Sequence, residues 1–196
     1  MPEIQHQQHQ QLVALVRQSP GLMRALSAGR SLGLASWCIG AGVVRNLVWD
    51  HLHGHRLVTP CDDLDLVYFD PDDLSTATEA RWRAQLSSCC PGPVWDVTNQ
   101  AAVHLWYAAK FGQEVEPLPS LVAGLATWPE VATAVGLCLT PQDQIEVLAP
   151  FGLDDLFNMH VRHNPARASA ETYRQRVRAK RFAQRWPGVV VFDAVN

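Results

Sequence analysis

The chain begins with two stretches whose apolar residues recur at helical spacing. Residues 3–18 place Leu12, Leu15 and Val16 on one face of a helix. A second helix, led by a proline, follows over residues 20–29. Two helices therefore precede the first predicted strand.

A strand, a glycine turn and a helix come next. The short apolar segment 35–39 ends at Gly40-Ala41-Gly42, and apolar residues at three-to-four spacing then predict a helix that ends before a glycine. A second strand is predicted over residues 63–69, where polar and apolar residues first alternate. Asp63 and Asp65 then share one face of that strand.

The rest of the chain mixes further helices and strands. Helices are predicted over 74–88, 99–111 and 169–185, with short helices around 120–134. Strands are predicted over 94–97, 135–139, 145–148 and 189–192. The second and third of these strands could form a hairpin, and the last could instead be an apolar anchor. This order is typical of an α+β (mixed α/β) fold, with a small mixed β-sheet flanked by helices.

Neither an internal repeat nor a long polar linker divides the chain. We therefore expect a single domain over residues 1–196. Its N-terminal helices would occupy 1–34, its catalytic core about 35–112, and a C-terminal extension about 113–196.

Composition places the chain among ordinary globular proteins. Of its 196 residues 47% are apolar, and the net charge is −3, which excludes disordered, collagen-like and coiled-coil classes. No apolar run approaches the roughly 18 residues of a membrane helix, and the first eleven residues are polar, so we expect a cytoplasmic protein without a membrane partner. The five cysteines show no CxxC spacing, so free, buried thiols are expected.

Asp63 and Asp65 are candidate metal ligands. Two carboxylates two residues apart on a strand point to the same side, and hard oxygen ligands suit Mg²⁺ or Mn²⁺. Such ions retain sites for substrate phosphates, so the pair favours phosphoryl or nucleotidyl transfer. Solvated acids at the end of a strand are the alternative interpretation.

Gly40-Ala41-Gly42 is a candidate phosphate seat. Small residues between a strand and a helix let backbone N–H groups and the positive end of the helix approach an anion. Arg45, on the first turn of that helix, could reach the same phosphate. The alternatives are a tight turn needed only for packing and an ordinary surface arginine.

These residues also carry a resemblance. GAGVVRN followed by DDLDLVYFD resembles the opening of the polymerase-beta-type nucleotidyltransferase superfamily, in particular tRNA nucleotidyltransferases and bacterial poly(A) polymerases. WDVTNQAAVHLWY, WPEVATAVG and APFGLDDLF are similar to an uncharacterised bacterial nucleotidyltransferase-like family, over nearly the whole chain. The resemblance implies a polymerase-beta-like nucleotidyltransferase fold.

The resemblance also implies roles for individual residues. It makes Gly40 and Gly42 contacts of the triphosphate through their backbone amides, and it makes Asp63 and Asp65 ligands of the catalytic metals. A third carboxylate is expected on a neighbouring strand, and Asp96 is the best candidate. Its alternative role is an N-terminal cap of the next helix.

Two positions depart from the superfamily pattern. Ala41 stands where relatives have glycine or serine, which weakens the expected phosphate contact. Asn46 replaces the aspartate that follows arginine in the tRNA-modifying relatives, which puts nucleotide selectivity in question.

Other polar and aromatic residues give weaker indications. His51, His53 and His55 alternate, but a helix would point the first two apart, so loop histidines are expected rather than zinc ligands. Three residues after Asp96 could line a base pocket, namely Asn99, His104 and Trp106. His104 and Trp106 could equally be partly buried core residues. The basic helix is expected to be solvated, with one or two arginines turned toward the site; its cations are Arg174, Arg176, Arg178, Lys180, Arg181 and Arg185.

The expected function is transfer of a nucleotidyl group from an NTP to an unidentified acceptor, with Mg²⁺ or Mn²⁺ as cofactor. The C-terminal half does not resemble the helical tRNA-binding body of the relatives, so a small molecule or a protein is expected as acceptor rather than tRNA. One alternative is a catalytically inactive module with the same fold that binds a nucleotide or a partner. A metal-dependent phosphohydrolase is a further alternative, disfavoured because no suitable histidine pair is present.

Overall fold

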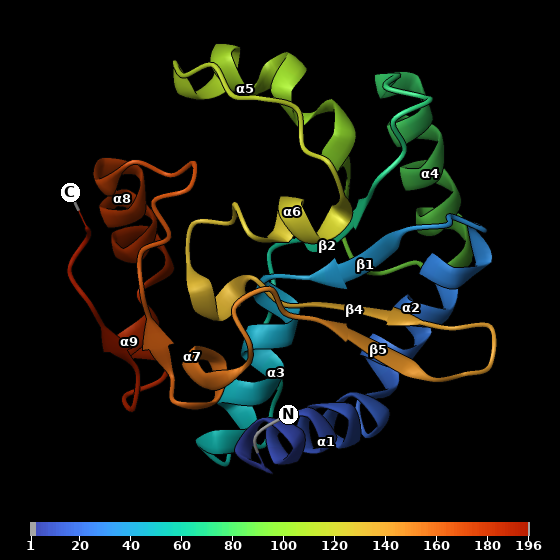
Figure 1. Ribbon diagram of the computed structural model, residues 1–196. Helices are drawn as coiled ribbons and strands as arrows, with labels where there is room; N and C mark the ends of the chain where they lie inside the picture. Colours follow the sequence, from blue (N-terminus) through green and yellow to red (C-terminus); the bar gives the residue numbers. More distant parts are fainter. Residues whose placement is uncertain (1–2, 196) are drawn as a thin grey trace.

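The computed structural model describes residues 3–195 and is built around a five-stranded mixed sheet (Figure 1). The outer limits of the predicted domain, residues 1 and 196, lie outside this range. The strand order is β3-β2-β1-β4-β5, and only β2 and β3 run parallel. The strands are β1 (Trp37–Gly40), β2 (Leu64–Tyr68), β3 (Trp95–Asn99), β4 (Gly136–Leu139) and β5 (Ile145–Leu148). The predicted mixed sheet and the predicted hairpin of β4 and β5 are confirmed.

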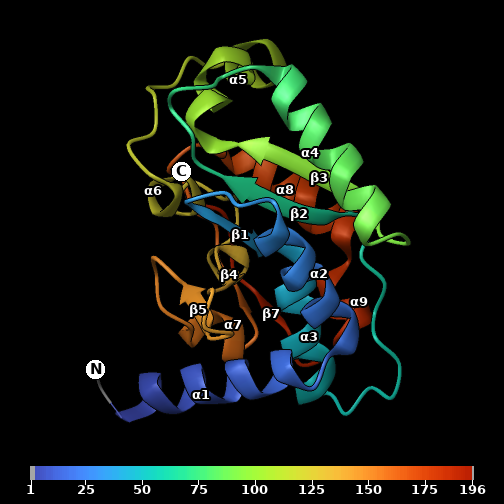
Figure 2. The same cartoon turned by 90° about the vertical axis from the view of Figure 1, so that its right-hand side faces the viewer.

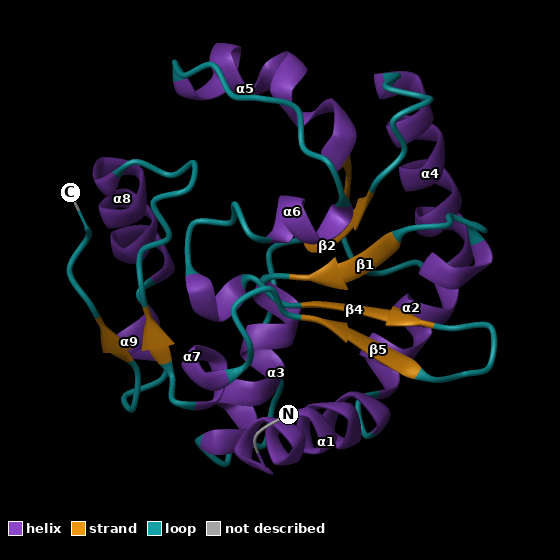
Figure 3. Cartoon of the chain, in the orientation of Figure 1, coloured by secondary structure: helices purple, strands orange, loops and turns teal. Residues whose placement is uncertain are grey.

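Helices flank this sheet, as Figures 2 and 3 show. The longer ones are α1 (Glu3–Arg17), α2 (Pro20–Ser31), α3 (Gly42–Leu52), α4 (Thr76–Cys89), α5 (Val103–Phe111) and α8 (Ala170–Lys180). The short ones are α6 (Leu121–Leu125), α7 (Asp154–Phe157), α9 (Phe182–Arg185) and the 3-10 turns η1 (Gln100–Ala102) and η2 (Val131–Thr133). No helix among the described residues has both the length and the apolar character to cross a bilayer.

The two faces of the sheet have different roles. Leu64, Leu66 and Tyr68 of β2 point into the main core, which α1, α2 and α3 also line. The opposite face carries a smaller apolar cluster, in which Cys38 and Val67 contact α6. Because side chains alternate along a strand, Asp65 shares the face of Val67, at the edge of this smaller cluster.

The C-terminal region differs from the sequence prediction. The predicted helix 169–185 is two helices, because Arg181 adopts a left-handed conformation with φ of 50° between α8 and α9. Strand β7 (Val190–Val191) pairs in parallel with β6 (His160–Val161), and β6 was not predicted. A two-residue strand leaves almost no alternation to detect, which explains the omission.

Asp50 ties the C-terminal region to α3. Its carboxylate accepts hydrogen bonds from the Thr59 backbone (2.6 Å), the Thr59 hydroxyl (2.6 Å) and the Trp186 indole (2.8 Å), and it contacts His55. Burial alone would raise the pKa of Asp50, but these hydrogen bonds outweigh it and lower the pKa. The carboxylate therefore stays ionised where two distant segments meet.

All five cysteines are free, as predicted. Only Cys38 and Cys90 are buried, whereas Cys89 is exposed and the other two are half-buried. The expectation of buried thiols was therefore too general.

Helix α2 offers a matched test of packing against the sheet. A Cβ added at Gly29 would lie 2.4 Å from the ring of Trp37, whereas one at Gly21 would meet nothing within 4 Å. We predict that Gly29→Ala lowers the free energy of unfolding by about 1–3 kcal/mol through overpacking. The control Gly21→Ala is expected to be neutral or to stabilise by up to about 1 kcal/mol. Urea unfolding measures both, and equal effects of the two substitutions would contradict the packing.

Candidate metal and nucleotide site

Three carboxylates meet at one end of the sheet. Asp63 directly precedes β2, Asp65 lies in β2, and Asp96 lies opposite Asp65 in the parallel register of β3. One carboxylate oxygen from each residue lies within 4.8 Å of those of the other two. The parallel pairing of β2 and β3 thus creates the cluster that the sequence predicted.

The cluster is electrostatically unfavourable without a cation. Burial, followed by the negative charges of Asp63 and Asp96, raises the pKa of Asp65 from its ordinary value of 3.8 to about 6. A divalent cation bound by the three oxygens would relieve this repulsion, and carboxylates are the ligands that Mg²⁺ and Mn²⁺ prefer. The donor set therefore fits a hard divalent ion.

Asp96 does not serve as a helix cap. The side chain of Asn99, three residues later, caps η1 by accepting a hydrogen bond from the Ala101 amide (3.1 Å). Asp96 is half-exposed, and its carboxylate lies 4.0 Å from the guanidinium of Arg83. The alternative role considered for Asp96 is therefore filled by another residue.

The glycine turn lies next to the carboxylates. Gly40, the last residue of β1, pairs with Asp65 in the antiparallel register. A Cβ on Gly40 would lie 2.6 Å from the carbonyl oxygen of Val135, so only glycine fits there without a shift. Ala41 adopts φ of 56°, a conformation that favours glycine, which marks it as a strained position.

One amide of this turn is already engaged. The Ala41 N–H donates to the carbonyl oxygen of Val135 (3.3 Å). The first intrahelical hydrogen bond of α3 runs from Arg45 N–H to Ala41 O, so the amides of residues 42–44 form the open N-terminus of the helix. These amides, rather than that of Ala41, are available to donate to an anion beside the carboxylates, and we call them the anion seat.

Arg45 is buried rather than extended into solvent. Its guanidinium lies over the rings of Trp49 (5.5 Å), Phe182 (5.0 Å) and Trp186 (5.7 Å), and it donates to the Asn46 side chain (2.8 Å). Burial lowers the pKa of Arg45. Arg45 still borders the pocket described next, so it lies next to the anion seat while it fastens α9 to α3.

A pocket of about 320 Å³ opens over the carboxylates. Its lining includes Asp63 and Asp65, together with Ala41 and Gly42 of the glycine turn. Cations of α8 and α9 and the rings of Trp106, Tyr107, Phe111 and Trp128 line it as well. Carboxylates, cations and rings therefore line the same cavity.

The cations of α8 are held in place by acids. Arg176 donates two hydrogen bonds to Glu130 (2.8 and 3.1 Å), which is fully buried. The Lys180 amine lies 3.2 Å from the Asp62 carboxylate. The sequence predicted one or two arginines turned toward the site. Arg176 and Arg185 line the pocket, and Lys180, which was not predicted, lines it too.

Several residues of the site could not be found from the sequence. Glu130 follows a Trp-Pro pair in a loop, where nothing marks it as the partner of an arginine 46 residues later. Tyr107 and Phe111 lie in a helix whose apolar pattern is that of a core helix. Trp106, considered for a base pocket or the core, is half-buried and lines the cavity over the aspartates. Asn99 is instead a buried cap that holds the loop at Asp70.

The alternating histidines do not form a metal site. His53 bonds to the Trp49 carbonyl (2.8 Å) and to the Gly188 amide (2.9 Å), and His55 contacts Asp50. Within residues 3–195, the three aspartates are the only group placed to share an ion. The expectation of loop histidines fits His53 and His55, which follow α3, whereas His51 lies exposed on that helix.

We predict that Asp65→Asn stabilises the protein in metal-free buffer at pH 7.5. The folded protein holds the Asp65 proton more tightly than the unfolded chain does, so the ionised form costs stability at neutral pH. Removing the charge is expected to raise the free energy of unfolding by about 1–3 kcal/mol. This gain should shrink as the pH falls from about 6 to about 4, because wild-type Asp65 then takes up its proton.

Thermal or urea unfolding with a chelator present measures the effect. The exposed Asp72 provides a matched control, since Asp72→Asn should change stability by less than about 0.5 kcal/mol. A destabilised Asp65→Asn variant at pH 7.5 would contradict the repulsion within the cluster.

Comparison with known proteins agrees with this geometry. A solved structure described as "The NMR structure of the protein reveals a CCA-adding enzyme head domain" is 29% identical, with a TM-score of 0.77 over 94% of this chain and 95% of its own. A tRNA-processing enzyme in an apo form is 18% identical and covers 88% of this chain and 42% of its own, with a TM-score of 0.50, which supports the fold alone. A search of curated proteins gave no match. Residues 27–191, most of the chain, match a nucleotidyltransferase family, and the chain therefore belongs to that family.

Proposed function

We propose that the protein transfers a nucleotidyl group from an NTP to an acceptor, with Mg²⁺ or Mn²⁺ bound by Asp63, Asp65 and Asp96. The observation that carries this proposal is the clustering of the three carboxylates, within 4.8 Å, beside an open helix N-terminus. A carboxylate cluster beside an anion seat suits a nucleoside triphosphate, because the phosphates of a triphosphate bind a divalent ion.

One group of residues binds the leaving part of the triphosphate. The amides at the start of α3 hold a phosphate oxygen, and Arg176 and Lys180 face the same cavity with positive charge. Fully buried Glu130 fixes the direction of Arg176. These groups bind and orient the leaving pyrophosphate.

The three aspartates act at the reacting end. When bound, a divalent ion supplies charge neutralisation of the triphosphate and a lowered pKa of the attacking hydroxyl. Asp96 is exposed, and in this proposal it accepts the hydroxyl proton of an acceptor that approaches from solvent. In-line displacement depends mainly on positioning and charge, so few further groups are needed.

We propose a small molecule or a protein as the acceptor. The solved structure at 29% identity is described as the head domain of a CCA-adding enzyme, which makes tRNA the acceptor to test against. Here the net charge of the chain is −3. A net negative charge gives little long-range attraction for a polyanion as large as tRNA, which favours a smaller acceptor.

We predict that the protein binds a non-hydrolysable NTP only when Mg²⁺ or Mn²⁺ is present. Asp63→Ala should weaken this binding by at least about 100-fold, because it removes a ligand of the ion. The matched control Asp72→Ala removes an exposed acid outside the pocket and should bind as wild type does. Isothermal titration calorimetry measures all three proteins.

Metal-independent NTP binding that survives in Asp63→Ala would favour the inactive binding module over the enzyme. For turnover, radiolabelled NTPs are incubated with Mg²⁺ and a mixture of small-molecule and protein acceptors, with tRNA in a separate reaction. We expect pyrophosphate release in the first reaction and its loss in Asp63→Ala. Release in the tRNA reaction alone would contradict the proposed acceptor class.

A further inference from the structure

Helix α5 presents aromatic rings to a pocket rather than to the core. Its sequence is VHLWYAAKF, yet Val103 is its only buried residue. Trp106, Tyr107 and Phe111 line the pocket above the aspartates, and Phe111 is 46% exposed. We call these three side chains the aromatic wall. In Figure 1, α5 extends beyond the sheet, on the side where α8 also lies.

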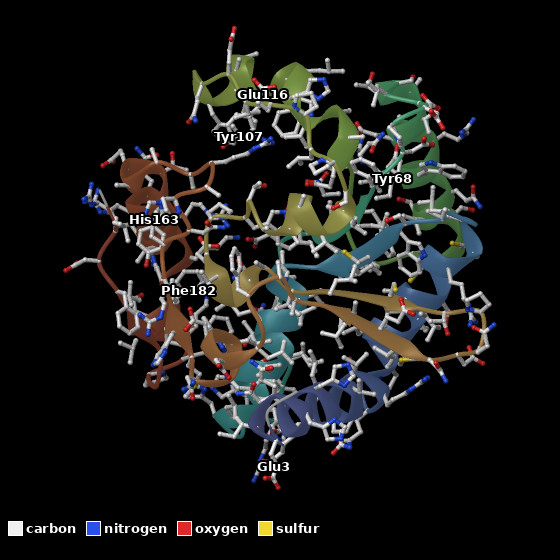
Figure 4. All side chains as sticks on the ribbon, viewed as in Figure 1. Glu3, Tyr68, Tyr107, Glu116, His163 and Phe182 are labelled. Atoms are coloured by element: carbon white, nitrogen blue, oxygen red, sulfur yellow. The ribbon has the colours of Figure 1, made fainter. Side chains whose placement is uncertain are left out.

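The aromatic wall is held in position. The Tyr107 hydroxyl donates to the Arg167 carbonyl (2.8 Å), which links α5 to the segment that leads into α8. The Tyr107 and Phe111 rings lie 4.6 Å apart between centroids, and those of Trp106 and Tyr107 lie 6.1 Å apart. Figure 4 labels Tyr107 on α5 near this segment. A fixed set of rings suits a planar ligand, because little side-chain entropy is lost on stacking.

A polar group lies in the same pocket. Gln100, in the turn between β3 and α5, is only 5% exposed and lines the pocket. No hydrogen bond from its side-chain amide is formed within the described part of the chain. Glycine at position 124 makes room for it, since a Cβ there would lie 2.7 Å from Gln100 Oε1. The Gln100 amide is not cut off from solvent, so it can hydrogen-bond a ligand that enters the pocket.

We propose that the aromatic wall stacks on the base of the bound NTP and that the Gln100 amide hydrogen-bonds the edge of that base. This inference rests on the proposed function, because the triphosphate is what brings the nucleoside into the pocket. Stacking of a base on an aromatic ring contributes about 1–3 kcal/mol to binding. A glutamine amide can both donate a hydrogen bond to a base edge and accept one from it.

Two features favour the base of the NTP over the acceptor as the occupant. First, a cavity of about 320 Å³ lies at the lower end of the range for small-molecule sites and is suited to one nucleoside beside its phosphates. Second, the nucleoside is bonded to the α-phosphate, which reacts at the aspartates in the proposed function. The nucleoside must therefore enter the cavity that the aspartates border. The acceptor can approach from the open side, where Asp63 and Asp96 are exposed.

The test compares two ligands that share a triphosphate. We measure the dissociation constants of Mg²⁺-bound non-hydrolysable NTP and of Mg²⁺-bound inorganic tripolyphosphate, which has no base, by calorimetry. Trp106→Ala and Tyr107→Ala are each expected to weaken NTP binding by about 10- to 100-fold and to leave tripolyphosphate binding within about twofold of wild type. The matched control Leu105→Ala removes an apolar side chain of the same helix that is 61% exposed and outside the pocket, and it should change neither constant.

Further variants separate stacking from misfolding and test the amide. Trp106→Phe keeps a ring and should retain most of the NTP affinity that Trp106→Ala loses. Gln100→Leu keeps the size of the side chain without its amide, and it should change the relative affinities of the four NTPs. If it leaves their ranking and ratios unchanged, the assignment of Gln100 to the base edge is wrong.

The outcomes distinguish this inference from the proposed function. If wild type binds both ligands and the two alanine variants bind NTP as tightly as wild type does, the base does not lie on the aromatic wall, and only this inference is overturned. If wild type binds neither ligand with Mg²⁺, the proposed function fails and this inference fails with it. A loss of both ligands in Trp106→Ala and Tyr107→Ala would indicate general disruption of the pocket and would also overturn the stacking role.

Discussion

Three negative charges crowded at one end of the sheet are the constraint around which the site is built. Asp65 is the most affected, since burial and its two neighbours raise its pKa to about 6. The stability of the fold does not require this cluster, because neutral side chains at these positions would give a higher free energy of unfolding. The fold therefore carries a local electrostatic cost that a bound cation or protonation of Asp65 would relieve. This is the pattern expected where stability is exchanged for function.

The register of three strands creates this arrangement. Gly40 lies opposite Asp65, and Asp65 lies opposite Asp96, so the glycine turn and two carboxylates fall on one line across β1, β2 and β3. A shift of one residue in the register of β2 or β3 would turn a carboxylate to the other face, into the core. The close approach of the Val135 carbonyl to Gly40 and the packing of Leu64 and Leu66 oppose such a shift.

The C-terminal half completes the cavity from the other side. Asp50 and the rings around Arg45 attach α9 to α3, and Glu130 attaches α8 to the loop that precedes β4. These contacts join residues more than 40 positions apart, and they hold Arg176, Lys180 and Arg185 at the pocket. The core strands thus supply the carboxylate cluster, whereas the later helices supply the cations that face it.

Local patterns predicted the elements well and the pocket only in part. The order of strands and helices, the paired aspartates and the glycine turn follow from periodicity and spacing within short segments. The break at Arg181, strand β6 and the role of Glu130 do not, because each depends on contacts with distant parts of the chain. Arg45 shows the same limit: its place on the helix was predictable, but the rings that bury it come from α9 as well as from α3.

The central claim is that Asp63, Asp65 and Asp96 hold a divalent ion next to the anion seat of α3. The most direct measurement is a crystal grown with Mn²⁺ and a non-hydrolysable NTP, with anomalous data collected at the manganese edge. We predict an anomalous peak within coordination distance, about 2.2 Å, of oxygens from Asp63 and Asp65, with phosphate density against the amides at the start of α3. A manganese peak elsewhere, or a triphosphate bound away from these carboxylates, would contradict the account.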